Sequence, residues 1–259
     1  MRTGKLLVGT NWKMNKTIRE SVDYTRQLLG RLEKLDRSDQ LQIFLIPPYT
    51  AIEAVKRVSE GRLWVGAQNM HWAERGAYTG EIAAPMLQEL GVDLVELGHA
   101  ERRRYFNETD ADLNRKVHTA LQHGFRPLVC VGEQLEDKQR GISKETVRNQ
   151  LHTIFAGVDG ACAPRLIVAY EPVWAIGAEG ADIGMDYVRD MQTHIRLTLR
   201  QTLGPGSAAA PVIYGGDVNL RNAAALVAES GTDGLFVGRA ALGAENFAAL
   251  IQASLQALT

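Results

Sequence analysis

The sequence has little cysteine, no long apolar run and no excess of charge of either sign. Cys130 and Cys162 are the only cysteines among 259 residues, so a disulfide framework is not expected and a reducing cytoplasm is predicted. The formal net charge is −1, which indicates neither a nucleic-acid partner nor a membrane-binding surface. No apolar run approaches the ~18 residues of a membrane span. Lys13 follows the short apolar stretch near the N-terminus, which therefore lacks the anatomy of a signal peptide.

What remains is the composition of an ordinary globular chain. Hydrophobic residues make up 45% of the sequence and charged residues 23%, a balance that can bury a substantial core. No linker-like shift in composition interrupts the chain, and the Gly-, Ala- and Pro-rich stretch Gly204–Pro211 has the length of a loop. We therefore expect a single domain over residues 1–259.

Short apolar runs alternate with amphipathic stretches along the whole chain. Most of these runs are continuously apolar, as in strands of a parallel sheet that is covered on both faces. The predicted strands are Lys5–Thr10, Leu41–Ile46, Leu63–Ala67, Leu94–Leu97, Pro127–Val131, Leu166–Tyr170, Val212–Gly215 and Gly234–Val237. Thr17 and Glu20 form a capping-box pattern that begins the first helix. Further helices are predicted at Ala111–His123, Lys144–Phe155, Asp186–Leu203, Asn219–Glu229 and Glu245–Leu258.

This alternation predicts right-handed βαβ units and the α/β class. Eight strands suit a closed (β/α)8 TIM barrel, although periodicity alone leaves an open doubly wound sheet possible. In a barrel, chemistry takes place at the carboxyl ends of the strands. The polar residues there are Asn11, Lys13, His99, Glu101, Glu171 and those of the turns Tyr214–Asp217 and Val237–Arg239.

Five stretches at these positions resemble the triosephosphate isomerase family. They occur in the family's order and spacing, and together they cover nearly the whole chain. They are GTNWKMN at Gly9–Asn15, ELGHAERR at Glu96–Arg103, CVGE at Cys130–Glu133, AYEPVWAIG at Ala169–Gly177 and YGGDVN at Tyr214–Asn219. The resemblance implies an isomerase of a small phosphorylated ketose or aldose, with neither a metal nor an organic cofactor.

The resemblance also assigns roles to the polar residues. Glu171 is the expected base, which removes a proton from the carbon next to a carbonyl. His99 is the expected electrophile, because a neutral imidazole can both donate and accept a proton. Lys13 supplies positive charge for the phosphate and the oxyanion, and Asn11 orients the lysine and the substrate. For Glu101 two interpretations remain open, support of Lys13 or a salt bridge with a neighbouring arginine.

Phosphate binding is expected from backbone N–H groups at glycine-rich turns. The candidates are Gly177 in the lid, Gly216 and Asp217 after the seventh strand, and Gly238 and Arg239 after the eighth. The barrel position favours them, because phosphate sites gather after strands seven and eight.

The sequence departs from the common family pattern in these same loops. The lid tip Ala178–Asp182 gains two acids and lacks a lysine, Asp217 stands where serine is usual, and Arg239 stands where a second glycine is usual. A carboxylate beside a phosphate is repulsive unless it is paired. We therefore hypothesise that Asp217 and Arg239 form an ion pair, with contact between Arg239 and the substrate as the alternative.

Other segments resemble a less common branch of the family, the bacterial tetrulose-phosphate isomerases. The segment Gln68–Glu81 and the Gly238–Arg239 turn carry this likeness. It implies L-erythrulose 1-phosphate as substrate and D-erythrulose 4-phosphate as product. His71, Trp72, Tyr78 and Thr79 fit the loop that reaches a partner subunit in this family, so the resemblance implies a homodimer.

Three functions are weighed. The first is a tetrulose-phosphate isomerase, the second is triosephosphate isomerase itself in glycolysis, and the third is a barrel that binds a sugar phosphate without catalysis. Loss of Glu171, His99 or Lys13 would favour the third, and all three are present. A Schiff-base lyase is disfavoured because Lys13 lies in a loop after its strand.

Overall fold

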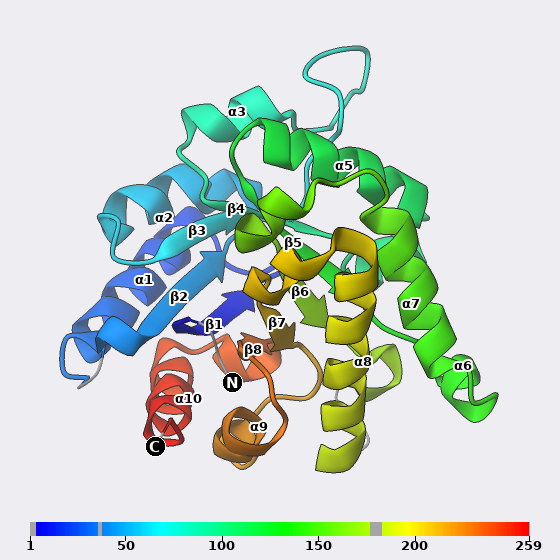
Figure 1. Ribbon diagram of the computed structural model, residues 1–259. Coiled ribbons are helices and arrows are strands. Elements are labelled where there is room, and N and C mark those ends of the chain that lie inside the picture. Colours follow the sequence, from blue (N-terminus) through cyan, green and yellow to red (C-terminus); the bar gives the residue numbers. More distant parts are fainter. Residues whose placement is uncertain (1–3, 36–37, 177–182, 259) are drawn as a thin grey trace.

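The eight predicted strands form a closed parallel barrel in the order β1 to β8 (Figure 1). The computed structural model describes residues 4–35, 38–176 and 183–258. The strands are β1 (Leu6–Asn11), β2 (Leu41–Ile46), β3 (Trp64–Ala67), β4 (Leu94–Leu97), β5 (Arg126–Val131), β6 (Ile167–Tyr170), β7 (Val212–Tyr214) and β8 (Gly234–Val237). β1 pairs with both β2 and β8, which closes the sheet and rules out the open alternative.

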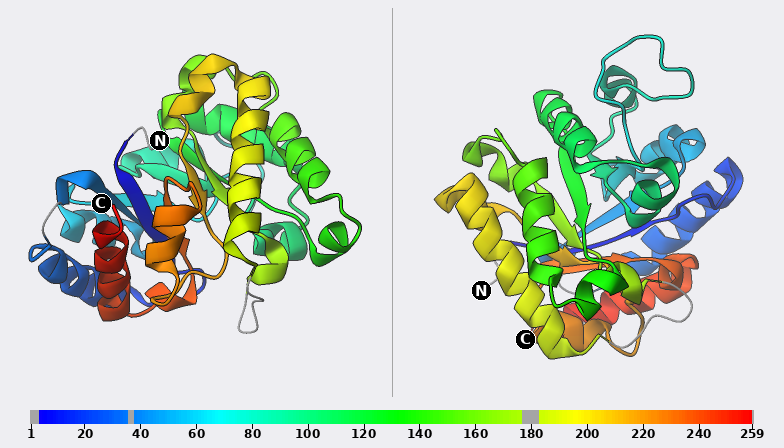
Figure 2. Two further views of the ribbon diagram at one scale, coloured as in Figure 1. Left: turned by 60° about the horizontal axis from the view of Figure 1, so that its bottom comes forward. Right: turned by 90° about the vertical axis from the view of Figure 1, so that its right-hand side faces the viewer.

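Helices surround the barrel and cover its outer face (Figures 1 and 2). Their bounds in the described part of the chain are α1 (Ile18–Leu32), α2 (Ile52–Ser59), α3 (Ala84–Glu89), α4 (Ala100–Phe106), α5 (Asp110–Gln122), α6 (Leu135–Gln139), α7 (Ser143–Ile154), α8 (Met185–Leu203), α9 (Ala223–Glu229) and α10 (Ala244–Gln256). The predicted capping box is present at the start of α1, where Thr17 and Glu20 exchange hydrogen bonds.

α9 begins four residues later than the sequence pattern predicted. Asn219 and Asn222 form side-chain hydrogen bonds in the loop before it, from Asn219 N–H to Asn222 Oδ1 and from Asn222 Nδ2 to the Asp217 carbonyl. Asparagine side chains compete in this way with helical hydrogen bonds. The segment is therefore a turn that shapes the loop after β7.

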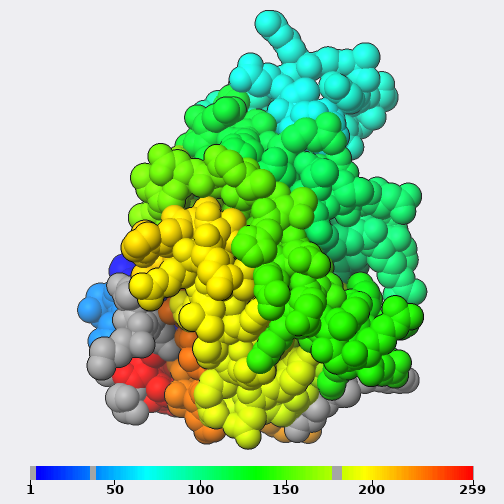
Figure 3. All heavy atoms as spheres, turned by 45° about the vertical axis from the view of Figure 1, so that its right-hand side comes forward, coloured from blue at the N-terminus to red at the C-terminus, as the bar shows by residue number. Residues whose placement is uncertain are grey.

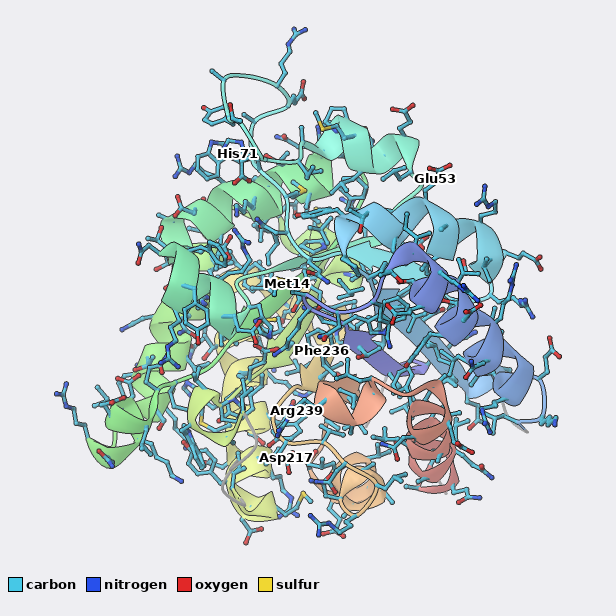
Figure 4. All side chains as sticks on the ribbon, turned by 180° about the vertical axis from the view of Figure 1, so that it is seen from behind. Met14, Glu53, His71, Asp217, Phe236 and Arg239 are labelled. Atoms are coloured by element: carbon cyan, nitrogen blue, oxygen red, sulfur yellow. The ribbon has the colours of Figure 1, made fainter. Side chains whose placement is uncertain are left out.

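The inward-facing side chains of the strands form an apolar core below the barrel mouth. Phe44 and Phe236 fill its centre with ring centroids 5.6 Å apart, and Phe236 is labelled in Figure 4. Gly9 provides space for this packing, because a Cβ there would lie 2.2 Å from the Phe44 ring. The packed interior forces any ligand to the upper end of the barrel, where the strands end in polar residues.

Candidate active site

A pocket of about 1030 Å³ opens at the carboxyl ends of the strands. One part of its wall, here called the strand half, consists of the polar side chains of Asn11, Lys13, His99 and Glu171. The other part, here called the loop half, consists of the loops after β7 and β8, with Gly216, Asp217, Gly238 and Arg239. The structure therefore brings together nine of the ten predicted site residues, since Glu101 also lines the pocket. The tenth, Gly177, lies outside the described residues.

Asn11 ends β1 and fixes the loop that carries Lys13. Its side chain is 8% exposed, and its Oδ1 accepts a hydrogen bond of 2.5 Å from the backbone N–H of Lys13. Lys13 has φ 54°, in the left-handed region that non-glycine residues seldom adopt. A second bond, of 2.8 Å, runs from Gln68 Nε2 to the Lys13 carbonyl. The backbone of Lys13 is thus held from both sides in an unusual conformation.

The ammonium group of Lys13 contacts Glu101. Lys13 Nζ lies 2.6 Å from Glu101 Oε1. Arg102 and Arg103 pair with Glu108 and Asp110 instead, at 3.3 and 2.6 Å. Of the two interpretations of Glu101, the geometry therefore favours support of the lysine.

His99 sits at the N-terminus of α4 and presents one ring nitrogen to the pocket. Gly98 precedes it with φ 77°, a conformation that suits glycine and turns the chain from β4 into the helix. His99 Nδ1 accepts a hydrogen bond of 3.1 Å from the backbone N–H of Glu101. An accepting Nδ1 leaves the proton of the neutral ring on Nε2. The imidazole can therefore donate a hydrogen bond to a ligand oxygen.

Glu171 directly follows β6 and is 3% exposed. Its backbone N–H donates to the Val131 carbonyl at 2.8 Å, whereas its carboxylate Oε2 has no hydrogen-bond partner among the residues that the structure describes. Gly215 makes room for this side chain, because a Cβ at that position would lie 2.8 Å from Glu171 Cγ. A buried, unpartnered carboxylate oxygen at the pocket wall can accept a proton from a ligand.

Glu96 is a site residue that the sequence analysis missed. It lies in β4, is fully buried, and its Oε2 accepts a hydrogen bond of 2.6 Å from Asn11 Nδ2. Burial raises the pKa of its carboxyl well above the usual value, and the Glu171 carboxylate raises it further against the opposing effect of Lys13. The available signal was an acid within an otherwise apolar strand run, Leu94–Leu97.

Among the described residues, Glu96, His99 and Glu171 form a group whose spacing could hold a metal ion. One atom from each lies within 4.8 Å of the others. Both Glu96 oxygens already accept protein hydrogen bonds, from Asn11 Nδ2 and from Cys130 Sγ. The ammonium of Lys13, in the same pocket, would also repel a divalent cation. The arrangement suits proton transfer better than metal binding.

In the loop half, the turn after β7 brings the backbone close to neighbouring side chains. A Cβ at Gly216 would lie 2.2 Å from the hydroxyl of Tyr214, so this position requires glycine. Asp217 and Arg239 come from neighbouring loops of the same pocket, as Figure 4 shows. Asp217 Oδ2 accepts a hydrogen bond of 3.0 Å from Asn219 Nδ2. The proposed ion pair between Asp217 and Arg239 stays a prediction.

Other polar residues of this pocket were not among the predicted site residues. They are Arg104, Tyr105, Asn219, Arg221 and Asn246. Arg104 and Tyr105 reach the pocket from α4, whereas the others come from α10 and the loop after β7. Asn219 ends the YGGDVN stretch, whereas the other four positions resemble ordinary surface residues, so no local pattern indicated those four.

Glu133 links the end of β5 to the segment after β6. It is fully buried and accepts hydrogen bonds from the Tyr170 and Tyr187 hydroxyls and from Trp174 Nε1, at 3.1, 2.9 and 2.8 Å. Burial raises the pKa of Tyr187 to about 12. Glu133 therefore anchors the segment that leads from Glu171 towards the predicted lid.

The loop after β3 projects from the barrel (Figures 1 and 3). His71 lies near its base, with ring centroids 4.2 Å from Trp72 and 4.1 Å from Tyr78. Arg115 covers the Trp72 ring at 3.8 Å. The homodimer predicted from this loop stays a prediction. In the described part of the chain, no helix is both long and apolar enough to cross a membrane.

Comparison with known proteins places this geometry in context. The family described as Triosephosphate isomerase matches residues 6–254. A relative from Mesorhizobium japonicum named L-erythrulose-1-phosphate isomerase is 46% identical over 242 residues, 93% of each chain. A triosephosphate isomerase from Acetivibrio thermocellus is 40% identical over 94% of this chain and 96% of its own. The crystal structure of triosephosphate isomerase from Bartonella henselae superposes with a TM-score of 0.85 at 30% identity, covering 96% of this chain and 98% of its own.

Proposed function

This chain belongs to the triosephosphate isomerase family, and from that premise we propose that it isomerises L-erythrulose 1-phosphate to D-erythrulose 4-phosphate. The meeting of Lys13, His99 and Glu171 in one pocket supports the isomerase chemistry. The substrate rests on the name of the Mesorhizobium relative.

The reaction moves a carbonyl by one carbon along a phosphorylated chain. Glu171 removes the proton from the hydroxyl-bearing carbon next to the carbonyl, through the carboxylate oxygen that has no partner in the described part of the chain. Lys13 and the Nε2–H of His99 stabilise the negative oxygens of the enediolate. Glu171 then returns a proton to the former carbonyl carbon, while the hydroxyl proton passes from one enediolate oxygen to the other through His99 Nε2, which completes the isomerisation without a net change in oxidation state.

The chemistry also indicates where a four-carbon substrate differs from a three-carbon one. The additional CH2OH group is attached to the carbon that loses its proton, and this carbon lies on the far side of the carbonyl from the phosphate. With the phosphate at the loop half, the extra group lies in the strand half, beside Asn11 and Glu171. Substrate length is then selected near the base, and the loop half contributes phosphate affinity to both substrates alike.

Triosephosphate isomerase activity is the second candidate. The 40% identity to the Acetivibrio enzyme favours it, and the same three residues would perform that reaction. A phosphate-binding barrel without catalysis is disfavoured, because the base, the electrophile and the lysine are all present and meet in one pocket.

The test is turnover of dihydroxyacetone phosphate and of L-erythrulose 1-phosphate by the same preparation. We expect the higher kcat/KM for the four-carbon substrate, and a fall in kcat of ~10²- to 10⁴-fold in Glu171→Gln. A higher kcat/KM for the triose would assign the chain to the second candidate. Equal turnover by wild type and Glu171→Gln would overturn the catalytic role of Glu171.

A further inference from the structure

Glu96 faces the interior of the barrel, directly below the strand half of the pocket. Its strand neighbours Val95 and Leu97 pack in the core between sheet and helices, whereas Leu94 belongs to the barrel interior. Side chains alternate along a strand, so Glu96 shares the inward face with Leu94. It is 0% exposed, and a carboxyl is a costly group to bury at such a place.

The contacts of Glu96 tie it to the proposed catalytic residues. Its Oε2 accepts the hydrogen bond from Asn11 Nδ2 at 2.6 Å, and its Oε1 is 3.8 Å from Cys130 Sγ. One of its carboxyl oxygens lies within 4.8 Å of a ring nitrogen of His99 and of a carboxylate oxygen of Glu171. Glu96 therefore contacts the pocket residue Asn11 without lining the pocket itself.

The Asn11 amide is the link between Glu96 and Lys13. Its Nδ2 donates to Glu96, while its Oδ1 accepts from the backbone N–H of Lys13. The bond to Glu96 fixes which way the amide points, and the amide in turn holds Lys13 at φ 54°. Without the carboxyl, the Asn11 amide can rotate and release the lysine loop from its unfavourable backbone conformation.

The charge of Glu96 matters because of its surroundings. The charged or titratable groups that face it are Lys13, His99, Glu101, Cys130 and Glu171. A second carboxylate beside Glu171 would repel both that base and the enediolate formed above it. Burial and the Glu171 charge favour the protonated form of Glu96.

We propose that Glu96 is a positioning residue of the isomerisation, whose carboxyl oxygen holds the Asn11 amide and, through it, the backbone of Lys13. The inference rests on the proposed function, and it predicts which property of the side chain matters. The acceptor oxygen is needed, whereas a negative charge is not.

The experiment compares kcat and KM of wild type, Glu96→Gln and Glu96→Leu. Glutamine keeps an oxygen that can accept from Asn11, so most of the wild-type kcat is expected to remain. Leucine removes it, and we expect kcat to fall by ~10- to 100-fold, as a displaced catalytic group causes. Leu94→Val is the matched control, since it perturbs the same inward face of β4 without contacting Asn11, and its kcat is expected to stay near that of wild type.

Each outcome of this comparison is decisive. A Gln variant as impaired as the Leu variant would overturn the proposal, because it would show that the charge is required. A Leu variant with wild-type kcat would overturn it as well, because no positioning would be needed. If wild type itself turns over neither sugar phosphate, the proposed function has failed rather than this inference.

The dependence of kcat on pH provides a second readout that a purely structural role would not change. Deprotonation of Glu96 adds a negative charge below the enediolate, so the ratio of wild-type to Glu96→Gln kcat should fall as pH rises. A ratio that increases with pH would contradict the proposal, since it would make the ionised acid the active form.

Discussion

The two halves of the pocket are held in place in different ways. In the strand half, buried side chains of β1 and β4 bind each other, as Asn11 does with Glu96. In the loop half, the residues come from the turns after β7 and β8. Asn219 and Asp217 bind each other within the first turn, and side chains of α1 and α10 bind the second, from Tyr24 to the Ala241 carbonyl and from Asn246 to the Ala240 carbonyl. The strand half therefore has the rigidity that proton transfer requires, whereas the loop half can change in sequence without disturbing the barrel.

The largest expected effect comes from crowding the base. Gly215→Ala places a methyl group 2.8 Å from Glu171 Cγ, and we expect kcat to fall by roughly 100-fold, because small displacements of a catalytic group are costly. Gly238→Ala is the matched change in the loop half, where an added Cβ meets no described residue within 4 Å, and it should leave kcat almost unchanged. Steady-state kinetics measure kcat of both variants. A lower kcat for Gly238→Ala than for Gly215→Ala would contradict this difference between the two halves.

A smaller effect is expected from the charges of the loop half. Arg239→Gln should raise KM about tenfold for both sugar phosphates, as loss of a charge-assisted hydrogen bond does, while the preference between the substrates persists. Asp217→Asn should lower KM, because it removes a carboxylate beside the phosphate. The double variant then measures their coupling. A change in substrate preference with Arg239→Gln would instead place length selection in the loop half.

The smallest effect is expected far from either half. Thr17→Ala removes the capping box of α1 and should lower the free energy of unfolding by about 1 kcal/mol. Denaturant unfolding measures this change, and kcat should remain that of the wild type. A reduced kcat in fully folded Thr17→Ala would mean that α1 influences the geometry of the pocket, which we do not expect.

The strand half could be predicted from sequence because parallel strands bring their carboxyl ends together. Asn11, His99 and Glu171 each follow an apolar run, so a barrel places them at one mouth. Glu96 escaped prediction because a four-residue run does not show which of its side chains face inward. The partner of Glu101 also could not be predicted from the sequence. Arg102 is its neighbour along the chain, and only the fold brings Lys13 into contact with it.

The loop half was less predictable for a physical reason. Its shape depends on side-chain hydrogen bonds such as those of Asn219 and Asn222, which shortened α9 relative to the apolar pattern. Arg104 and Tyr105 reach the pocket from a helix whose residues look like ordinary surface. Glycine-rich turns indicated where this half lies, and they could not indicate which charges face each other.

The most direct test of the central claim is proton exchange on the substrate itself. L-erythrulose 1-phosphate is incubated in D2O with wild type or with Glu171→Gln, and the proton on the carbon next to the carbonyl is followed by NMR. We expect wild type to remove this proton and to place deuterium on the former carbonyl carbon of the isomer, and Glu171→Gln to do so ~10²- to 10⁴-fold more slowly. Equal exchange rates in the two proteins, or no exchange with wild type, would contradict an enediolate mechanism with Glu171 as the base.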